Sequence, residues 1–334
     1  MPHVLVIGPA WVGDMVIAQS LFMLLRDRQP TVDIDVLAPG WSLPLLRRMP
    51  EVRAAVEMPV QHGELALRAR RRLGLALRPH GYDWAIVLPN AFKSALVPFW
   101  ARIPRRTGYL GEWRWGLLND IRPLDKRRLP MIVQRFLALA LAPAAELPAA
   151  VPIPRLRSDP VSLALTLTRL GLRRPDGRLL ALCPGAEFGP AKRWPAAHYA
   201  QVARELAAEG WTVWVLGSAR DAPVCRTVVD QAGAGVNLAG ATSLEEAIDL
   251  LSLADVVIAN DSGLMHVAAA LDRPLIALYG SSDPGYTPPL NPRAQIMRLG
   301  LPCSPCFKRE CPLGHLACLQ NLDPRQVLAR IPGR

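Results

Sequence analysis

One stretch of the sequence combines residue types that suit an anion. The four residues Asn260–Gly263 follow the apolar run Asp255–Ala259 and open a helix-forming segment that contains His266. A strand that enters a helix in this way leaves free backbone N–H groups at the helix N-terminus, where the helix dipole also favours a phosphate. Gly263 allows a close approach of the backbone, and His266 lies one turn after Ser262. The stretch therefore predicts a phosphate site. The alternative is ordinary helix capping, with His266 as a buried core histidine.

Three further loops carry residues suited to the same ligand. The loop Cys183–Pro195 contains two glycines for a close approach and Lys192 as a point charge. Asp221 follows the next strand and suits either ribose hydroxyl groups or a helix cap. A capping box begins at Ser243, and the neighbouring Leu244 is placed to contact an adenine ring. A lysine and a helix N-terminus at one site neutralise a diphosphate without a metal, which strengthens the phosphate interpretation.

The first glycine-containing turn offers a carboxylate rather than a dinucleotide site. The segment Gly8–Asp14 matches the G-x-G-x-x-G pattern poorly, because Ala10 replaces the second glycine and crowds the approach of a pyrophosphate. The acids about 20 residues further on, Asp33 and Asp35, stand inside a strand pattern rather than at its end. Asp14 remains at the carboxyl end of the first strand, where open α/β sheets place their sites. It serves there either as a reacting group or as an N-cap.

Basic residues gather in the first half of the chain. Lys93 and Ser94 follow another strand end, on the same rim as Asp14. Arginines among aromatic residues come next: Arg105, Arg106 and Arg114. Such groups suit carboxylates, phosphates and sugar faces. The first 150 residues hold 20 Lys and Arg against 12 Asp and Glu, a net charge of +8, whereas the remainder hold 19 against 16, or +3. We therefore expect an anionic partner for the first half, and no nucleic-acid recognition motif accompanies this charge.

Alternating strand and helix patterns predict the elements that position these residues. Strands are expected at 3–7, 32–38, 52–57 and 83–88, and again at 178–183, 211–216, 255–259 and 274–279. Helix-compatible runs lie between them: 15–28, 41–49, 64–78, 195–209, 220–232, 243–252 and 262–271. The alternation predicts two α/β domains, each with a doubly wound parallel sheet. The Pro- and Ala-rich segment 143–156 is the expected linker between domains 1–150 and 151–334.

Composition narrows the class of protein. A chain of 334 residues with 51% hydrophobic content is large enough for two folded domains. No apolar run reaches the length of a bilayer span, and no basic segment with a cleavage site opens the chain. The sequence therefore predicts a cytosolic protein.

The motifs also carry a family resemblance that covers nearly the whole chain. Six segments contribute to it: Gly8–Met15, Leu88–Leu96, Arg106–Gly108, Leu117–Asp120, Cys183–Pro195 and Asn260–Ala270. Together they resemble the lipopolysaccharide heptosyltransferases of glycosyltransferase family 9, most closely the heptosyltransferase II branch. The resemblance implies the GT-B fold, in which two Rossmann-like domains face each other across a central cleft. It also implies an inverting transfer of L-glycero-D-manno-heptose from ADP-heptose to heptosyl-Kdo-lipid A, without cofactor or metal.

The resemblance assigns roles to individual residues. Asp14 matches the family's proposed general base. Lys192, Ser262, Gly263 and His266 match its donor-diphosphate contacts, and Asp221 matches the ribose-contact position less closely. The expected donor site, in domain 151–334, is completed by Leu244 and Asp261. The expected acceptor site, in domain 1–150, comprises Lys93, Ser94, Arg105, Arg106 and Arg114. The acceptor's carboxylates and phosphates would bring the protein to the anionic inner face of the inner membrane.

Four of the six cysteines stand in one segment: Cys303, Cys306, Cys311 and Cys318. Their spacing is compatible with zinc or an iron–sulfur cluster but matches no standard finger. Stable disulfides are disfavoured in the cytosol. A structural metal, reduced thiols and a disulfide all remain open, and none of them would take part in catalysis.

Four other functions fit parts of the sequence. Heptosyltransferase I would act on Kdo-lipid A itself. A GT-B nucleotide-sugar 2-epimerase would need no lipid acceptor, which leaves the basic first half without a purpose. In a non-enzymatic binding module Asp14 would be only a cap, and an NAD oxidoreductase conflicts with Ala10.

Overall fold

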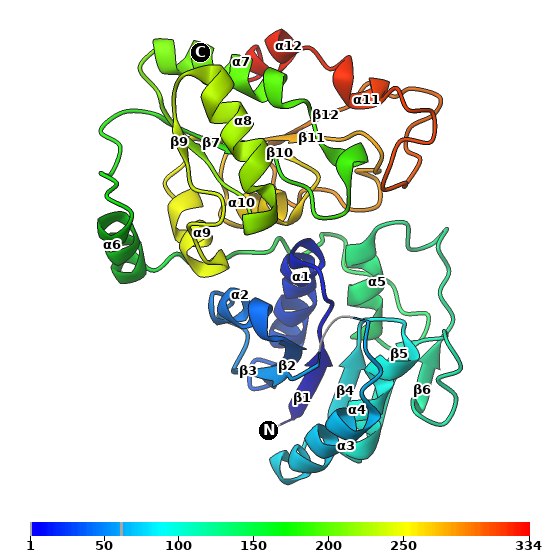
Figure 1. Ribbon diagram of the computed structural model, residues 1–334. Helices are drawn as coiled ribbons and strands as arrows, with labels where there is room; N and C mark the ends of the chain where they lie inside the picture. Colours follow the sequence, from blue (N-terminus) through cyan, green and yellow to red (C-terminus); the bar gives the residue numbers. More distant parts are fainter. Residues whose placement is uncertain (1, 61–62) are drawn as a thin grey trace. The chain divides into compact units, whose positions relative to one another are not determined.

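The computed structural model describes residues 2–60 and 63–334, and these residues form two compact units. The first unit is Met1–Pro154 and the second is Arg155–Arg334. Each unit is a parallel six-stranded sheet with helices on its faces (Figure 1). Residues 140–159, between the last helix of the first unit and the first helix of the second, are neither helix nor strand.

The sheet of the first unit has the strand order β3-β2-β1-β4-β5-β6. Its strands are β1 (His3–Ile7), β2 (Asp33–Pro39), β3 (Ala54–Met58), β4 (Trp84–Val87), β5 (Arg105–Tyr109) and β6 (Asp120–Arg122). Its helices are α1 (Val12–Arg28), α2 (Leu43–Arg47), α3 (Leu67–Ala76), α4 (Leu96–Trp100) and α5 (Ile132–Leu139). All neighbouring strands are parallel, so the carboxyl ends of β1 to β5 meet at one edge.

The sheet of the second unit has the order β12-β11-β10-β7-β8-β9. Its strands are β7 (Leu179–Cys183), β8 (Thr212–Val215), β9 (Val236–Asn237), β10 (Val256–Asn260), β11 (Leu275–Leu278) and β12 (Ala294–Met297). Its helices are α6 (Pro160–Arg169), α7 (Ala196–Ala208), α8 (Ala222–Ala232), α9 (Leu244–Leu251), α10 (Gly263–Ala270), α11 (Ala317–Gln320) and α12 (Pro324–Leu328). The strand order reverses between β7 and β10, which is where doubly wound sheets place ligands.

Continuous apolar strands explain why both sheets are buried on two faces. In β7, β10 and β11 every residue is buried, as expected for strands that are covered by helices on both sides. Leu180, Leu182 and Ile258 of these strands share one hydrophobic core with side chains of α7, α8 and α12. In the first unit Leu5 and Ile7 belong to a core with side chains of α3 and α4. Period-two alternation sends the neighbouring strand residues to the opposite face.

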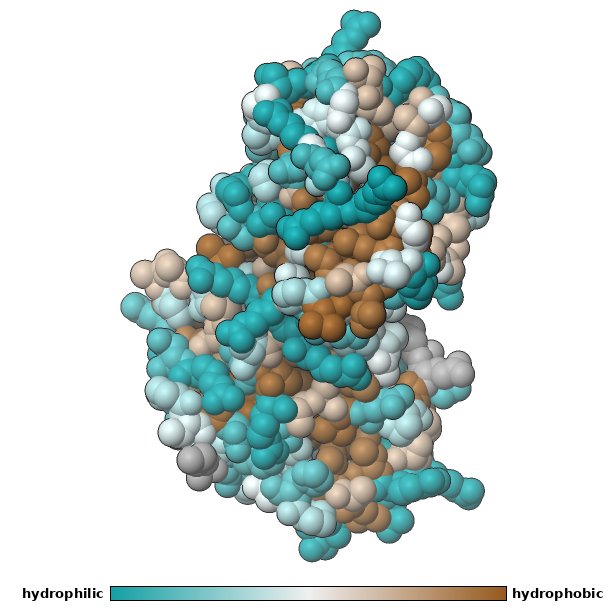
Figure 2. All heavy atoms as spheres, turned by 90° about the vertical axis from the view of Figure 1, so that its left-hand side faces the viewer, coloured by the Kyte–Doolittle hydropathy of each residue, from teal (hydrophilic) through white to brown (hydrophobic). Residues whose placement is uncertain are grey.

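Every strand predicted from the sequence is present, and four others were not predicted. The unpredicted strands, β5, β6, β9 and β12, lie toward the outer edges of their sheets. They are short or polar, so their sequences lack the apolar runs that mark the central strands. Among the described residues no helix is long and apolar enough to cross a bilayer. Apolar side chains nevertheless reach the surface between hydrophilic ones, as Figure 2 shows for one face.

Candidate functional site

The connection from β10 to α10 forms a helix N-terminus at the carboxyl edge of the second sheet. Ser262 occupies the N-cap position with extended backbone angles, φ −148° and ψ 172°, and its side chain makes no capping hydrogen bond. The alternative interpretation of this stretch was ordinary helix capping, and the Ser262 side chain does not cap α10. The first N–H groups of an α-helix have no partner inside the helix, so the start of α10 suits an anion.

Asn260, the last residue of β10, fixes the neighbouring loop after β7. Its fully buried Oδ1 accepts hydrogen bonds from the Trp194 backbone N–H and the Tyr199 hydroxyl group, each at 3.0 Å. Its Nδ2 donates to the Pro184 carbonyl oxygen at 2.7 Å. One amide side chain thus ties both ends of the loop between β7 and α7 to β10. This loop carries Lys192, so the amide fixes the approach of the lysine to α10.

A charged cluster lies directly before α10. The Nζ atom of Lys192 lies 2.5 Å from Asp261 Oδ2, and both side chains are largely buried. His266 Nε2 lies 3.9 Å from Asp261 Oδ1. Burial lowers the pKa of His266 to about 4; Asp261 acts to raise it and Lys192 to lower it further. The imidazole is therefore neutral at neutral pH. An anion at this site has to share Lys192 with Asp261, because the two are already paired.

Asp221 is a buried capping residue in the loop after β8. Its Oδ2 accepts hydrogen bonds from the Ser218 backbone N–H at 3.1 Å and from the Ser218 hydroxyl group at 2.7 Å. Its Oδ1 is buried without a hydrogen-bond partner among the described residues and lies 3.7 Å from an Arg193 nitrogen. A Cβ at Gly185 would overlap this carboxylate, so only glycine fits there. Capping thus accounts for one oxygen of Asp221, and the other keeps hydrogen-bonding capacity.

The remaining donor-site prediction concerns Leu244. It is the first residue of α9 and is half-buried. Ser243 and Glu246 form the predicted capping box, with Glu246 N donating to Ser243 Oγ at 3.2 Å and Ser243 N to Glu246 Oε2 at 2.8 Å. The polar residues of this loop are therefore occupied by capping.

Sequence reasoning left out two neighbours of these groups. The Phe188 ring lies below the Lys192 ammonium group, 5.1 Å from Nζ to the ring centroid. Arg193 approaches Asp221, as described above. Both residues lie in the segment Cys183–Pro195, which was already predicted to bind the ligand. An aromatic residue and a second cation close to Lys192 in that segment were the available indication of their role.

Asp14 lies at the carboxyl edge of the first sheet. It is half-buried in the first turn of α1, where a negative charge is favourable to the helix dipole. Trp11 rather than Asp14 occupies the N-cap position, so the N-cap interpretation of Asp14 was wrong. Gly8 precedes α1, and a Cβ there would lie 2.5 Å from Met15 Cε, so a larger residue would require the Met15 side chain to shift.

The predicted acceptor residues separate into three groups. Lys93 and Ser94 lie in the loop after β4, on the same edge as Asp14. Arg105 and Arg106 begin β5 and are in register with Trp84 and Ala85, at the opposite, amino edge of the sheet.

Arg105 and Arg106 make internal contacts at that edge. Arg105 pairs with Asp120 at 3.1 Å and stacks on the Trp84 ring. Arg106 donates to the carbonyl oxygens of Leu117 and Ile103, each at 2.6 Å. The structure therefore does not bring these two arginines together with Asp14, because they open a strand that was not predicted from the sequence and lie at its amino end.

Arg114 has an internal role. It is 1% exposed, and its guanidinium group donates to the carbonyl oxygens of Pro89 (2.8 Å) and Tyr109 and to Asn90 Oδ1 (3.2 Å). These contacts tie the loop after β5 to the loop after β4. Arg114 therefore holds two loops together instead of presenting its charge to solvent.

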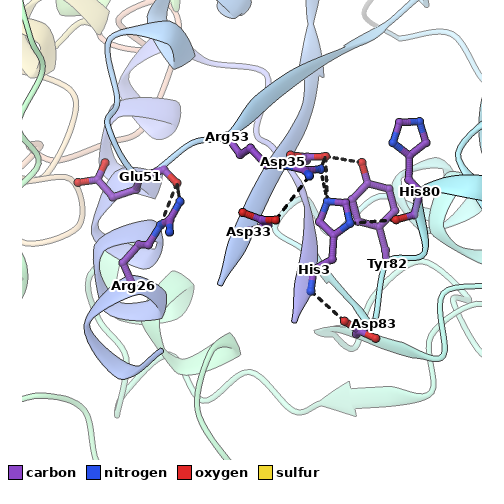
Figure 3. A network of polar contacts seen from close by, with 9 residues as sticks. All are labelled: His3, Arg26, Asp33, Asp35, Glu51, Arg53, His80, Tyr82 and Asp83. Carbon is purple, nitrogen blue, oxygen red and sulfur yellow. Dashed lines mark hydrogen bonds and ion pairs between the residues drawn. The ribbon is translucent and has the colours of Figure 1, made fainter. Parts of the chain in front are cut away.

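A polar network toward the amino edge of the first sheet accounts for the acids of β2 (Figure 3). Asp35 is buried and accepts hydrogen bonds from Arg53 Nε at 2.9 Å and the Tyr82 hydroxyl group at 2.7 Å, and His3 Nε2 lies at 3.1 Å. Burial acts to raise the pKa of Asp35, but these hydrogen bonds outweigh it and lower the pKa. Asp33 pairs with Arg53 at 3.5 Å. Asp35 is thus held inside the domain and Asp33 lies at the amino end of β2, so neither stands at the carboxyl end of the strand, where the ribose of a dinucleotide would bind.

The cysteine segment contains no disulfide, and all six cysteines of the chain are free thiols in the described part of the chain. Backbone N–H groups, that of Leu316 first, lower the pKa of Cys311, whereas burial raises the pKa of Cys318. Within residues 2–60 and 63–334 no group of three His, Cys, Asp or Glu side chains is arranged to hold a metal ion.

Two parallel six-stranded sheets in separate units, each with its charged loops at the carboxyl edge, define the GT-B class of glycosyltransferases. Residues 70–317 match the family model described as "Glycosyltransferase family 9 (heptosyltransferase)", so the chain belongs to this family. The sequence is 47% identical to lipopolysaccharide heptosyltransferase 2 of Salmonella typhimurium, with 98% of this chain and 97% of that protein covered. The resemblance inferred from the motifs is confirmed, and the protein is a glycosyltransferase.

Two further comparisons bear on the branch of the family. The structure of E. coli ADP-heptose lps heptosyltransferase II matches with a TM-score of 0.88 and 44% identity, covering 99% of this chain and 97% of that one. Lipopolysaccharide heptosyltransferase 1 of Pseudomonas aeruginosa is 36% identical over 128 residues, which cover 36% of this chain and 34% of that protein.

Proposed function

We propose that this protein transfers L-glycero-D-manno-heptose from ADP-heptose to heptosyl-Kdo-lipid A, the inner core of lipopolysaccharide. The observation that carries the proposal is the similarity to lipopolysaccharide heptosyltransferase 2 along almost the entire chain. The heptosyltransferase 1 relative matches only about a third of the chain, which favours the second transfer over the first. Membership of a glycosyltransferase family sets aside the epimerase, the oxidoreductase and the non-enzymatic module.

Asp14 is the general base of an inverting displacement in this proposal. The acceptor hydroxyl oxygen attacks the anomeric carbon from the face opposite ADP, the carbon–oxygen bond to the diphosphate breaks, and the hydroxyl proton passes to Asp14. One carboxylate is enough, since ADP leaves without protonation by a second acid. The position of Asp14 supports this role, because it lies half-buried at the sheet edge where α/β folds place reacting groups.

Lys192 and the start of α10 stabilise the leaving diphosphate. The lysine lies beside the free N–H groups of the helix N-terminus, so both act on the charge that grows as the bond to ADP breaks. The neutral His266 serves as a hydrogen-bonding partner rather than a second cation. Asp221 Oδ1, which accepts no hydrogen bond from the described residues, and the side chain of Leu244 complete the donor site toward ribose and adenine.

The two units divide the ligands. The first unit, with its net charge of +8, takes the anionic acceptor through Lys93 and Ser94, and the second takes ADP-heptose. The acceptor is a membrane lipid, so the protein works in the cytoplasm at the inner face of the inner membrane.

Incubation of the purified protein with ADP-heptose and either acceptor tests the proposal. Product should form with heptosyl-Kdo-lipid A and not with Kdo-lipid A, as followed by mass spectrometry of the lipid. If product forms with Kdo-lipid A and not with heptosyl-Kdo-lipid A, the protein carries out the first heptose transfer instead of the second. The absence of product with both acceptors, in a preparation that binds ADP, would remove the proposed acceptor.

A further inference from the structure

The loop after β5 carries the two most exposed tryptophans of the described chain. Trp113 is 86% exposed and Trp115 is 62% exposed, and Leu110 before them is also exposed. Neither indole N–H donates to a protein group in residues 2–60 and 63–334. Soluble surfaces rarely display neighbouring large apolar side chains without a partner. We call residues Gly111–Gly116 the tryptophan loop.

The tryptophan loop is held in this outward conformation by its own anchors. Arg114, between the two indoles, is buried and bonds to Pro89 and Asn90, so it points inward while its neighbours point outward. The Glu112 carboxylate accepts a hydrogen bond from the Phe92 backbone N–H at 2.7 Å. Glu112 and Trp113 have positive φ angles, 39° and 54°, which are strained for residues with a side chain. The hydrogen bonds of Arg114 and Glu112 and the backbone conformation of the loop therefore fix the two indoles in their exposed positions.

A second apolar and basic segment borders the same edge of the sheet. Leu65 and Leu67, at the start of α3, are both exposed. The buried Arg70 connects them to the loop after β4, because it donates to the carbonyl oxygens of Leu65 at 2.7 Å and Lys93 at 3.4 Å. Lys93 follows Phe92, whose backbone N–H donates a hydrogen bond to Glu112 in the tryptophan loop.

Exposed arginines flank these leucines on α3: Arg68, Arg71 and Arg72. Apolar tips beside guanidinium groups are the composition of segments that lie in a membrane interface.

We infer that the tryptophan loop and the start of α3 form one docking surface for an anionic lipid bilayer. Indole rings settle at the headgroup level of membranes, because one end is apolar and the N–H still finds water or a headgroup oxygen. The arginines of α3 attract anionic headgroups, and the net charge of +8 in the first unit acts in the same direction. Leu65 and Leu67 add apolar area that enters the interface together with the indoles.

This inference deepens the proposed function, since a lipid-linked acceptor is presented at a bilayer. A docking surface on the acceptor-binding unit raises the local concentration of the enzyme where its acceptor resides. Neither Asp14 nor Lys192 belongs to the docking surface, so its residues can be replaced while both of these groups are kept.

Co-sedimentation with vesicles tests the inference. The wild-type protein should partition onto vesicles of phosphatidylcholine with about one third phosphatidylglycerol, and much less onto pure phosphatidylcholine. The double variant Trp113→Ser/Trp115→Ser should partition at least about tenfold less, and the triple variant Arg68→Gln/Arg71→Gln/Arg72→Gln should lose its preference for the anionic vesicles. Leu165→Ser removes an equally exposed apolar residue on α6 and should leave partitioning unchanged.

Circular dichroism and thermal unfolding should show that each variant folds as the wild type does. A Trp113→Tyr/Trp115→Tyr variant should retain intermediate partitioning, because tyrosine also prefers the interface.

Two outcomes would overturn the inference. Unchanged partitioning of the folded tryptophan double variant would show that the loop does not meet the bilayer. The transfer rate of the Trp113→Ser/Trp115→Ser variant provides the second outcome. If this rate falls equally with the native acceptor and with a deacylated, water-soluble acceptor, the indoles bind sugar instead of lipid. The vesicle measurement needs no substrate. It therefore tests the docking surface even if the protein does not catalyse the proposed heptose transfer.

Discussion

At the residue scale, the arrangement of Lys192, Asp261 and His266 sets the charge of the donor site. The lysine and the carboxylate form one ion pair, and burial keeps the imidazole neutral. The sequence placed all three near a ligand but did not reveal that Lys192 pairs with a residue 69 positions away. Spacing along a chain shows which residues share a helix or a loop, whereas a contact between loops depends on the packing of the sheet between them.

Replacement of Asp14 and replacement of Lys192 should have different effects on turnover and on ADP affinity. Asp14→Asn keeps the shape but removes the base, so turnover should fall by roughly 10²–10⁴ while ADP affinity changes little. Lys192→Ala should weaken ADP binding and also slow transfer by about 10²-fold or more, because the diphosphate charge grows in the transition state.

Steady-state kinetics and ADP titration distinguish the two variants. Matched controls are Asp27→Asn, at the other end of α1, and Lys308→Ala, on an exposed loop. An almost fully active Asp14→Asn enzyme would contradict the proposed mechanism.

His266 should make stability depend on pH. Its pKa in the folded protein, about 4, lies below its ordinary value of 6.5, because burial disfavours the charged form. Between these two values the unfolded chain binds a proton that the folded chain does not, so stability falls as pH falls through this window. The loss from this one group is about 2 kcal/mol between pH 7 and pH 5.

Urea unfolding of wild type and His266→Gln at both pH values measures this contribution. The variant should show a shallower pH dependence by that amount, whereas His315→Gln, at an exposed position, should not. Identical slopes for wild type and His266→Gln would mean that the imidazole binds its proton equally well in the folded and the unfolded protein, which contradicts the lowered pKa.

At the element scale, Asn260 joins the end of β10 to the loop between β7 and α7. Asn260→Ala would leave the Trp194 N–H, the Tyr199 hydroxyl group and the Pro184 carbonyl oxygen without their partner inside the core. We expect a loss of about 2–4 kcal/mol in the free energy of unfolding, together with weaker ADP binding. Chemical denaturation measures the first effect, with the exposed Asn321→Ala as the control. A loss as small as that of the control would show that the loop is fixed by other contacts.

The sequence predicted the central elements well and the edges poorly. Apolar runs such as Leu179–Cys183 mark strands buried on both faces, and these were placed within a residue or two. Strand β5 was missed because Arg105 and Arg106 open it, and its order comes from pairing with β4 rather than from its own pattern. Because this strand was not predicted, the position of Arg105 and Arg106 at the amino edge of the sheet could not be inferred from the sequence. Helix α5 did carry a signal, since Ile132, Val133, Phe136 and Leu137 repeat with helical spacing.

At the scale of the whole molecule, charge is unevenly divided between the two units. The first carries +8 and the second +3, so salt should act more strongly on the acceptor than on the donor. Raising ionic strength should raise the apparent KM for the acceptor while ADP affinity changes less. Initial rates and ADP titration over a series of salt concentrations measure both. Equal losses for the two ligands would contradict the division of ligands between the units.

The division of the chain at Pro154 has a consequence for biosynthesis. Each unit is one uninterrupted stretch, and β1 to β6 all precede the first strand of the second sheet. The ribosome therefore releases every strand of the first sheet before β7 is made, and the first unit can fold while translation continues. The nascent chain then holds one finished sheet, while the six strands β7 to β12, among them the fully buried β7, β10 and β11, still await their partners. Aggregation during synthesis should thus begin from the second unit.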